Sequence, residues 1–145
     1  DTIDKINTVA KKLAPCGFKF SYHNHGHEFV KFNNKTVLDY IVENTDPEVV
    51  SICLDVYFAQ QSGMDVRKLI EDLTGRIDII HLKDMSRNEK EPYIAYIGEG
   101  NLNWKGIIES ARKSGVKYFV VEQDDCLGRD PFVCLENSFN YLKNL

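Results

Sequence analysis

Apolar residues recur at helical spacing in several segments of the chain. They predict helices over residues 2–14, 36–44, 65–73 and 104–114, and a last helix from Pro131 onward. Pro15 and Gly17 mark the expected end of the first helix. Asp130 and Pro131 form a favourable N-cap and first-turn pair for the last one. This helix is expected to pack into the core through its apolar positions, which are Phe132, Val133, Leu135, Phe139 and Leu142.

Short apolar runs rich in β-branched and aromatic residues separate these helices. They predict strands over residues 18–22, 49–56, 76–82 and 116–123. The run over 49–56 is nearly continuous, which is typical of a parallel strand buried on both faces. Strands that alternate with helices imply a parallel sheet with right-handed crossovers. A flavodoxin-like open sheet fits this pattern as well as a barrel does, because periodicity alone does not separate the two.

Composition bounds the class of protein. The chain has 145 residues, 43% hydrophobic and 28% charged, with a net charge of −4, which suits a single globular domain. It has no basic stripe for nucleic acid and no apolar run long enough for a membrane span. Its first residues carry charges throughout, unlike a signal peptide. Because the four cysteines form no CxxC pair, reduced thiols and a cytoplasmic location are expected.

Residues able to bind a metal follow each predicted strand. The first strand leads to His23, and the next three lead to Asp55, His81 and Glu122. Carboxyl ends of parallel strands share one face of the sheet, where active sites are built. Two imidazoles and two carboxylates on that face predict a divalent cation site, with Mn²⁺, Co²⁺, Mg²⁺ and Zn²⁺ as candidates.

Each of these residues also has a purely structural interpretation. Asp55 alone could cap a turn or helix, and His81 alone could be a hydrogen-bonded core histidine. Glu122 is harder to explain in that way, because a carboxylate at the end of a buried strand is costly unless it is paired or bound to metal. The repetition, one residue per strand, favours the metal site.

Five stretches carry a resemblance to a known family. They are YHNHGHEF (22–29), CLDVYFAQQSGMDV (53–66), IIHLKDM (79–85), YIGEGNLNW (96–104) and VVEQDD (120–125). In this order and spacing they resemble strands five to eight of the sugar phosphate isomerase/epimerase family, which has a xylose isomerase-like TIM barrel. The resemblance implies an α/β fold of parallel (β/α) repeats. Residues 1–145 would then form one domain, the C-terminal half of the barrel.

The family's usual metal ligands are Glu, Asp, His and Glu at the ends of strands five to eight. Asp55, His81 and Glu122 match the last three of these positions. The fifth-strand position departs from the pattern, since His23 stands there instead of Glu. Glu28, in the following loop, is an alternative ligand, and the sequence leaves both open.

The resemblance implies a metal-dependent sugar or sugar phosphate isomerase or epimerase that acts through an enediolate. Glu122 is the first candidate for a group facing the reacting carbon, and His25 is the second candidate base. Lys83 is a candidate for neutralising the enediolate, against the alternative of a solvated lysine paired with Asp84. A small-molecule sugar is the expected substrate.

Three other functions compete with this one. A keto-sugar dehydratase or lyase on the same fold shares the enolisation step. A non-catalytic half-barrel or binding module would keep the site without turnover. A phosphodiesterase of the endonuclease IV kind is disfavoured, because the chain has only four histidines and no basic groove.

Half of a barrel leaves two sheet edges and an apolar face without partners. We therefore expect either that the half-barrel is part of a longer barrel, or that dimerisation completes it. Self-association through the exposed edges is the expected behaviour of the isolated chain.

Overall fold

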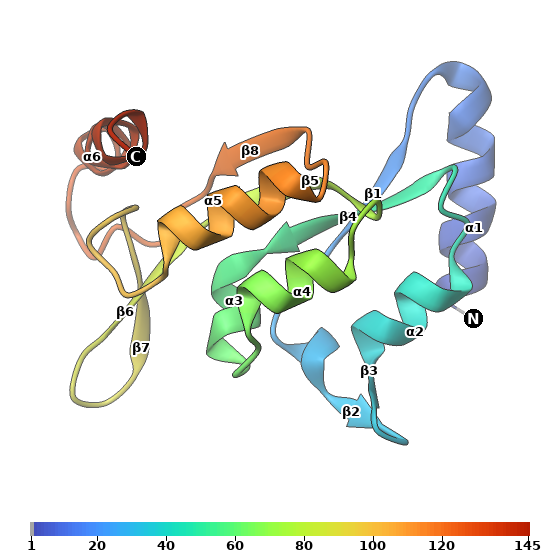
Figure 1. Cartoon of the computed structure of the whole chain (residues 1–145), viewed down its shortest axis with the longest axis horizontal. Coiled ribbons are helices and arrows are strands. Elements are labelled where there is room, and N and C mark those ends of the chain that lie inside the picture. The colour runs from blue at the N-terminus through green and yellow to red at the C-terminus, as the bar shows by residue number, and fades with distance from the viewer. Residues whose placement is uncertain (1) are drawn as a thin grey trace.

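The computed structural model describes residues 2–145, and their central element is a four-stranded parallel sheet. Its strands are β1 (Phe20–His23), β4 (Val50–Asp55), β5 (Ile77–Leu82) and β8 (Tyr118–Val121), arranged in chain order (Figure 1). A flavodoxin-like sheet would reverse direction after its first strand. The unbroken order is that of a (β/α)8 barrel, so the structure decides between the two predicted folds.

The predicted helices all form, within a few residues of their expected bounds. They are α1 (Thr2–Leu13), α2 (Val37–Asn44), α4 (Val66–Asp72), α5 (Trp104–Lys113) and α6 (Pro131–Lys143). Side-chain caps fix the starts of the last four. Asp65, Asn103 and Asp130 each accept backbone N–H bonds, and Thr36 forms a capping box with Asp39. Local sequence therefore sets where these helices begin.

Several short elements lie outside the predictions. Helix α3 (Val56–Gln61) follows β4 directly. Strand β6 (Asp84–Arg87) pairs with β7 (Pro92–Ala95), and β2 (Lys31–Phe32) pairs with β3 (Lys35–Thr36). The 3₁₀ turns η1 (Ala14–Cys16) and η2 (His27–Phe29) complete the set. All of these lie in the connections between sheet and helices, where hydrophobic periodicity is short or absent.

The main core lies between the sheet and the helices in front of it in Figure 1. Ile52, Leu54 and Ile80 are fully buried there, together with Ile107 of α5. Because side chains alternate across a strand, Asp55 lies on the opposite face of β4 from Leu54. The register pairs Asp55 with His81, so both residues lie on the face of the sheet away from these helices.

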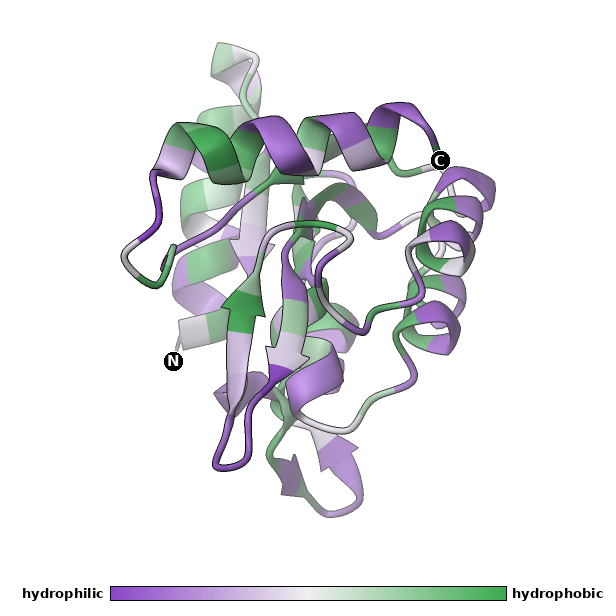
Figure 2. Cartoon of the chain, turned by 90° about the vertical axis from the view of Figure 1, so that its left-hand side faces the viewer, coloured by the Kyte–Doolittle hydropathy of each residue, from purple (hydrophilic) through white to green (hydrophobic). Residues whose placement is uncertain are grey.

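The prediction for the apolar face of α6 is wrong. Phe132, Val133, Leu135 and Phe139 are 81%, 51%, 51% and 60% exposed, and only Leu142 packs against the core. The buried residues of this helix are Cys134 and Ser138. The spacing correctly identifies an apolar face on α6. Among residues 2–145, however, no strand pairs with the outer edge of β8, and most of this helix face stays exposed to solvent. Figure 2 shows hydrophobic residues recurring along this helix, which ends at the C-terminus.

Among residues 2–145, no helix combines the length and apolar character that crossing a bilayer requires.

Candidate metal centre

His23, Asp55, His81 and Glu122, here called the donor cluster, meet at the carboxyl ends of the four sheet strands. One ligand atom from each can be chosen so that all four lie within 4.8 Å of one another. His23 Nε2 lies 3.4 Å from Asp55 Oδ2, and His81 Nδ1 lies 2.9 Å from Glu122 Oε2. The parallel register brings these residues together, as the sequence predicts.

The spacing and chemistry of the donor cluster fit a divalent ion. Metal–ligand bonds to imidazole nitrogen and carboxylate oxygen are about 2.0–2.2 Å, so ligand atoms around one ion lie up to about 4.4 Å apart. A contraction of a few tenths of an ångström would bring the whole cluster into coordination. Mixed nitrogen and oxygen donors suit Mn²⁺, Co²⁺ and Zn²⁺, while Mg²⁺ prefers oxygen alone.

Asp55 uses its two carboxylate oxygens for different tasks. Oδ1 caps α3 by accepting bonds from the backbone N–H groups of Tyr57 (2.9 Å) and Phe58 (3.3 Å). Oδ2 faces His23 in the donor cluster. The capping and ligand interpretations of the sequence are therefore compatible, and the cap fixes the orientation of the oxygen that faces the cluster.

Asn24 is a positioning residue that the sequence analysis missed. Its side chain is fully buried and accepts a 2.9 Å bond from the backbone N–H of Asp55. Its amide nitrogen donates to the Asp55 carbonyl at 3.4 Å. These bonds tie the ends of β1 and β4 together beside the cluster. The only available signal was an asparagine between two histidines at the end of a predicted strand.

Lys83 is a buried member of the site. Its side chain is 1% exposed, and its Nζ lies 2.9 Å from Asp55 Oδ2, 2.7 Å from Glu122 Oε2 and 2.7 Å from Asp124 Oδ2. Burial alone would lower its pKa, but the bonds to Asp124, Glu122 and Asp55 raise it above the usual value, so the ammonium stays charged. The alternative of a solvated lysine paired with Asp84 is wrong.

The same contacts act on Glu122. Burial favours its neutral form, but the hydrogen bond from Lys83 and the nearby His81 lower the pKa of this carboxyl below its ordinary value. Glu122 is therefore an anion at neutral pH, as a metal ligand or a general base must be.

Asp84 organises the loop beside the site instead of joining it. Fully buried, it accepts bonds from Trp104 Nε1 (2.7 Å) and from the backbone N–H groups of Gly98 (2.8 Å) and Gly100 (3.1 Å). A Cβ on Gly100 would lie 2.3 Å from Asp84 Oδ1, so this approach requires glycine. Residues 98–100 (GEG) therefore form a loop held by the Asp84 carboxylate.

Glu28 lies apart from the donor cluster. Its side chain is 2% exposed and accepts bonds from Tyr22 Oη (2.7 Å) and the backbone N–H of His25 (2.7 Å), with His27 Nε2 2.7 Å from Oε1. Burial acts to raise its pKa, but these bonds and the charge of His27 lower it. Because both oxygens are engaged in holding the loop, the structure does not support Glu28 as the replacement for His23.

A row of rings extends from the cluster to the surface. The His25 ring centroid lies 4.8 Å from that of His23 and 5.0 Å from that of Phe58. His27 stacks on His25 at 5.8 Å with an interplanar angle of 8°. The exposed position of His25 beside the cluster leaves it accessible to a substrate.

The family model described as xylose isomerase-like TIM barrel matches residues 1–143. The chain belongs to this family. Membership confirms the resemblance predicted from the five sequence stretches, and it confirms the fold class.

Several relatives are similar along almost the whole chain. The inosose dehydratase of Geobacillus thermodenitrificans is 27% identical over 96% of this chain and 49% of its own length. Two crystal structures of sugar phosphate isomerase/epimerases from Parabacteroides distasonis superpose with TM-scores of 0.84 and 0.80, at 23% and 27% identity. These alignments cover 99% and 98% of this chain and 52% and 50% of theirs. The chain thus spans about half the length of each of these relatives.

Proposed function

We propose that the chain carries the metal centre of a metal-dependent sugar or sugar phosphate isomerase or epimerase that acts through an enediolate. The observation that supports this most directly is the donor cluster, in which two imidazoles and two carboxylates approach within 4.8 Å at the active face of the sheet. The names of the Parabacteroides distasonis proteins and the shared barrel fold support the same reaction class.

A bound divalent ion would supply Lewis acidity, which polarises a carbonyl and favours loss of the neighbouring proton. The donor cluster would hold this ion. Glu122 is the proposed base, because its lowered pKa keeps it ionised at neutral pH. His25, exposed beside the cluster, is the second candidate to take or return a proton.

Lys83 has an electrostatic role in this proposal. Its buried ammonium lies among three carboxylates on the reacting face. A positive charge held beside the reacting face stabilises negative charge that develops on a substrate oxygen. The substrate is a small polyhydroxylated ketone or aldehyde, whose hydroxyl groups suit a face rich in imidazoles and carboxylates.

Dehydration of a keto-polyol is the second candidate. The similarity to inosose dehydratases over 95–96% of the chain favours it. Both reactions begin with removal of the proton next to the carbonyl. Isomerisation or epimerisation then returns a proton to carbon, whereas dehydration breaks a neighbouring C–O bond and releases the hydroxyl, protonated, as water.

Chelation and reconstitution test the proposal. Treatment with a chelator should abolish turnover of a panel of keto-sugars and inososes, and added Mn²⁺, Co²⁺ or Zn²⁺ should restore it. Proton exchange with deuterated solvent at the carbon next to the carbonyl should appear in either reaction, and product analysis separates isomers from dehydrated products. Full turnover after verified removal of metal would eliminate the mechanism.

A further inference from the structure

Lys83 bonds the same oxygen atoms that face the histidines of the donor cluster. Asp55 Oδ2 lies 3.4 Å from His23 Nε2 and 2.9 Å from Lys83 Nζ. Glu122 Oε2 lies 2.9 Å from His81 Nδ1 and 2.7 Å from Lys83 Nζ. The ammonium and a coordinated ion would therefore share two oxygens.

Sharing these oxygens places two cations close together. A metal–oxygen bond is about 2.1 Å, so an ion on Asp55 Oδ2 would lie no more than about 5 Å from an Nζ that is 2.9 Å from the same oxygen. At that separation in a poorly solvated site the repulsion between an ammonium and a divalent ion is substantial. The ion and the ammonium cannot both keep their best positions.

The third carboxylate gives the ammonium another place to bind. Asp124 Oδ2 lies 2.7 Å from Lys83 Nζ, and the Asp124 side chain is 53% exposed, outside the donor cluster. A small rotation of the flexible lysine stem toward Asp124 would free the two shared oxygens while keeping the charge paired.

We propose that Lys83 competes with the divalent ion for Asp55 and Glu122, and that Asp124 holds the ammonium when an ion binds. Lys83 thereby sets the metal affinity of the site, and in the absence of metal it keeps the two carboxylates together and offsets part of their charge. This inference rests on the metal site of the proposed function, but it concerns ion affinity and not turnover.

Variants of the two residues should change metal affinity in opposite directions. Lys83→Met removes the competing charge with little change in volume, so Mn²⁺ and Zn²⁺ should bind at least about tenfold more tightly. Asp124→Asn removes the alternative partner, so binding should weaken by about two- to fivefold. Because misfolding lowers affinity, it cannot produce tighter binding in Lys83→Met.

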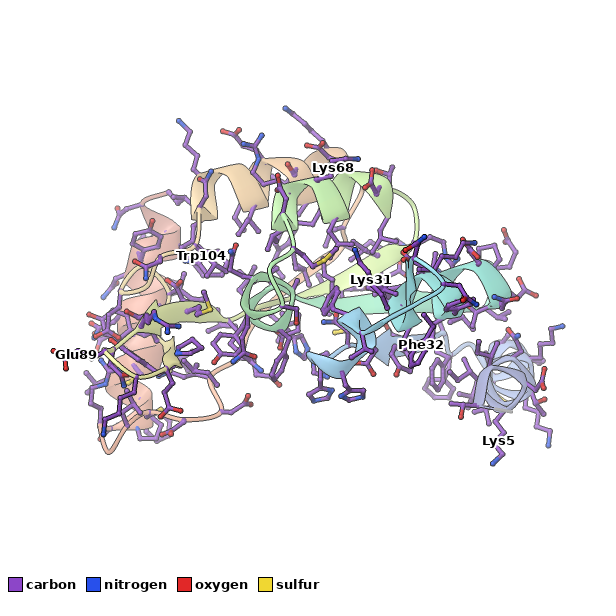
Figure 3. The ribbon with its side chains drawn as sticks, turned by 90° about the horizontal axis from the view of Figure 1, so that it is seen from below. Lys5, Lys31, Phe32, Lys68, Glu89 and Trp104 are labelled. Carbon is purple, nitrogen blue, oxygen red and sulfur yellow. The ribbon has the colours of Figure 1, made fainter. Side chains whose placement is uncertain are left out.

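Isothermal titration calorimetry of the chelator-treated chain at one fixed pH provides the measurement, with circular dichroism to verify folding. Lys68→Met is the matched control, since Lys68 pairs with Asp72 at 2.6 Å on the exposed side of α4 (Figure 3). Its metal affinity should equal that of the wild type. If Lys83→Met does not fold, Lys83→Gln replaces it with the same expectation.

The possible outcomes separate this inference from the proposed function. Equal or weaker metal binding by folded Lys83→Met overturns the competition and leaves the proposed enzyme standing. Opposite shifts in Lys83→Met and Asp124→Asn, together with no turnover of any keto-sugar or inosose, support the competition and overturn the enzyme. Absence of metal binding in every variant, the wild type included, overturns both.

Discussion

At the scale of single residues, Glu28 lies outside the donor cluster but makes several contacts that hold the neighbouring loop in place. It joins the Tyr22 hydroxyl on β1 to the backbone of His25 and to the imidazole of His27. Hydrogen bonds to a buried charged group contribute about 1.5–3 kcal/mol each, and their loss leaves donors unpaired. Glu28 should therefore stabilise the loop that presents the candidate base His25.

Glu28→Gln should lower the free energy of unfolding by about 2 kcal/mol at pH 7, because the amide has one acceptor oxygen where the carboxylate has two, so it cannot accept from Tyr22, His25 and His27 as the carboxylate does. The pKa of Glu28 is lowered in the folded chain, so its stabilisation is present above the unfolded-state pKa of about 4.3 and is lost as pH falls through the folded value. Urea unfolding at pH 7 and pH 3.5 should show the difference between wild type and variant shrinking in acid.

Glu43→Gln is the control for this experiment, because Glu43 pairs with Lys35 in an exposed ion pair. It should leave the midpoint nearly unchanged at both pH values. A difference between Glu28→Gln and wild type that stays constant down to pH 3.5 would contradict the assigned ionisation.

The donor cluster could be predicted from the sequence because it depends only on which residue ends each strand and on the strands being parallel. A residue that ends a parallel strand must lie at the active edge, whatever the rest of the fold does. The sequence left two interpretations open for Lys83, since a lysine after a strand is ordinarily solvated, and it did not single out Asn24. The burial of Lys83 among three carboxylates depends on Asp124, whose position is set by a different strand and loop.

At the scale of elements, the connection from β5 to α5 depends on one buried carboxylate. Asp84 accepts bonds from Gly98, Gly100 and Trp104, and also from the backbone of Met85 and Leu102. A carboxylate can accept all of these, whereas an amide offers only one acceptor oxygen. The loop that follows the candidate ligand His81 therefore owes its shape to the hydrogen bonds that this one side chain accepts.

Asp84→Asn should cost about 2–4 kcal/mol of unfolding free energy, because several buried donors lose their acceptor. Trp104 is the chain's single tryptophan and is 2% exposed, so its fluorescence reports directly on this loop. Its emission should shift to the red in the variant. Asp72→Asn, in an exposed pair with Lys68, should change neither stability nor emission appreciably. Unchanged emission and an unchanged urea midpoint in Asp84→Asn would refute this account of the loop.

Most elements were predictable, since caps and periodicity agree. Asp65, Asn103 and Asp130 mark helix starts in the sequence and cap them in the structure. Helix α3 was missed because it has only six residues and follows β4 without a loop. The β6–β7 hairpin was missed because its strands are short and flank a polar turn.

At the scale of the whole molecule, several exposed apolar side chains gather on one helix, α6. Phe132, Leu135 and Phe139 lie one to two turns apart on α6 and, with Val121 of β8, line a groove of about 440 Å³. Helix α1 lies at the opposite end (Figure 1). The spacing of apolar residues identified the apolar face of α6, but this spacing does not show whether another part of the fold packs against that face.

This groove predicts how the isolated chain behaves in solution. An unpaired strand edge beside exposed aromatic residues favours association. A closed barrel has one helix over each junction between strands, and two copies would bring α1 of one and α6 of the other to the same junction. We therefore expect self-association through α6 and β8 instead of closure into a regular eight-stranded barrel.

Sedimentation velocity over a range of concentrations tests this expectation. The wild type should sediment increasingly as dimers or larger species as its concentration rises. The double variant Phe132→Glu with Phe139→Glu should remain monomeric, because charges in the groove oppose burial of its walls.

Phe32→Glu, at an exposed site on the β2–β3 hairpin away from α6, is the matched control and should behave as wild type (Figure 3). Since Phe132 and Phe139 are 81% and 60% exposed, the double substitution should leave the chain folded. Wild type that stays monomeric at every concentration, or equal association of the double variant, would show that this surface does not drive assembly.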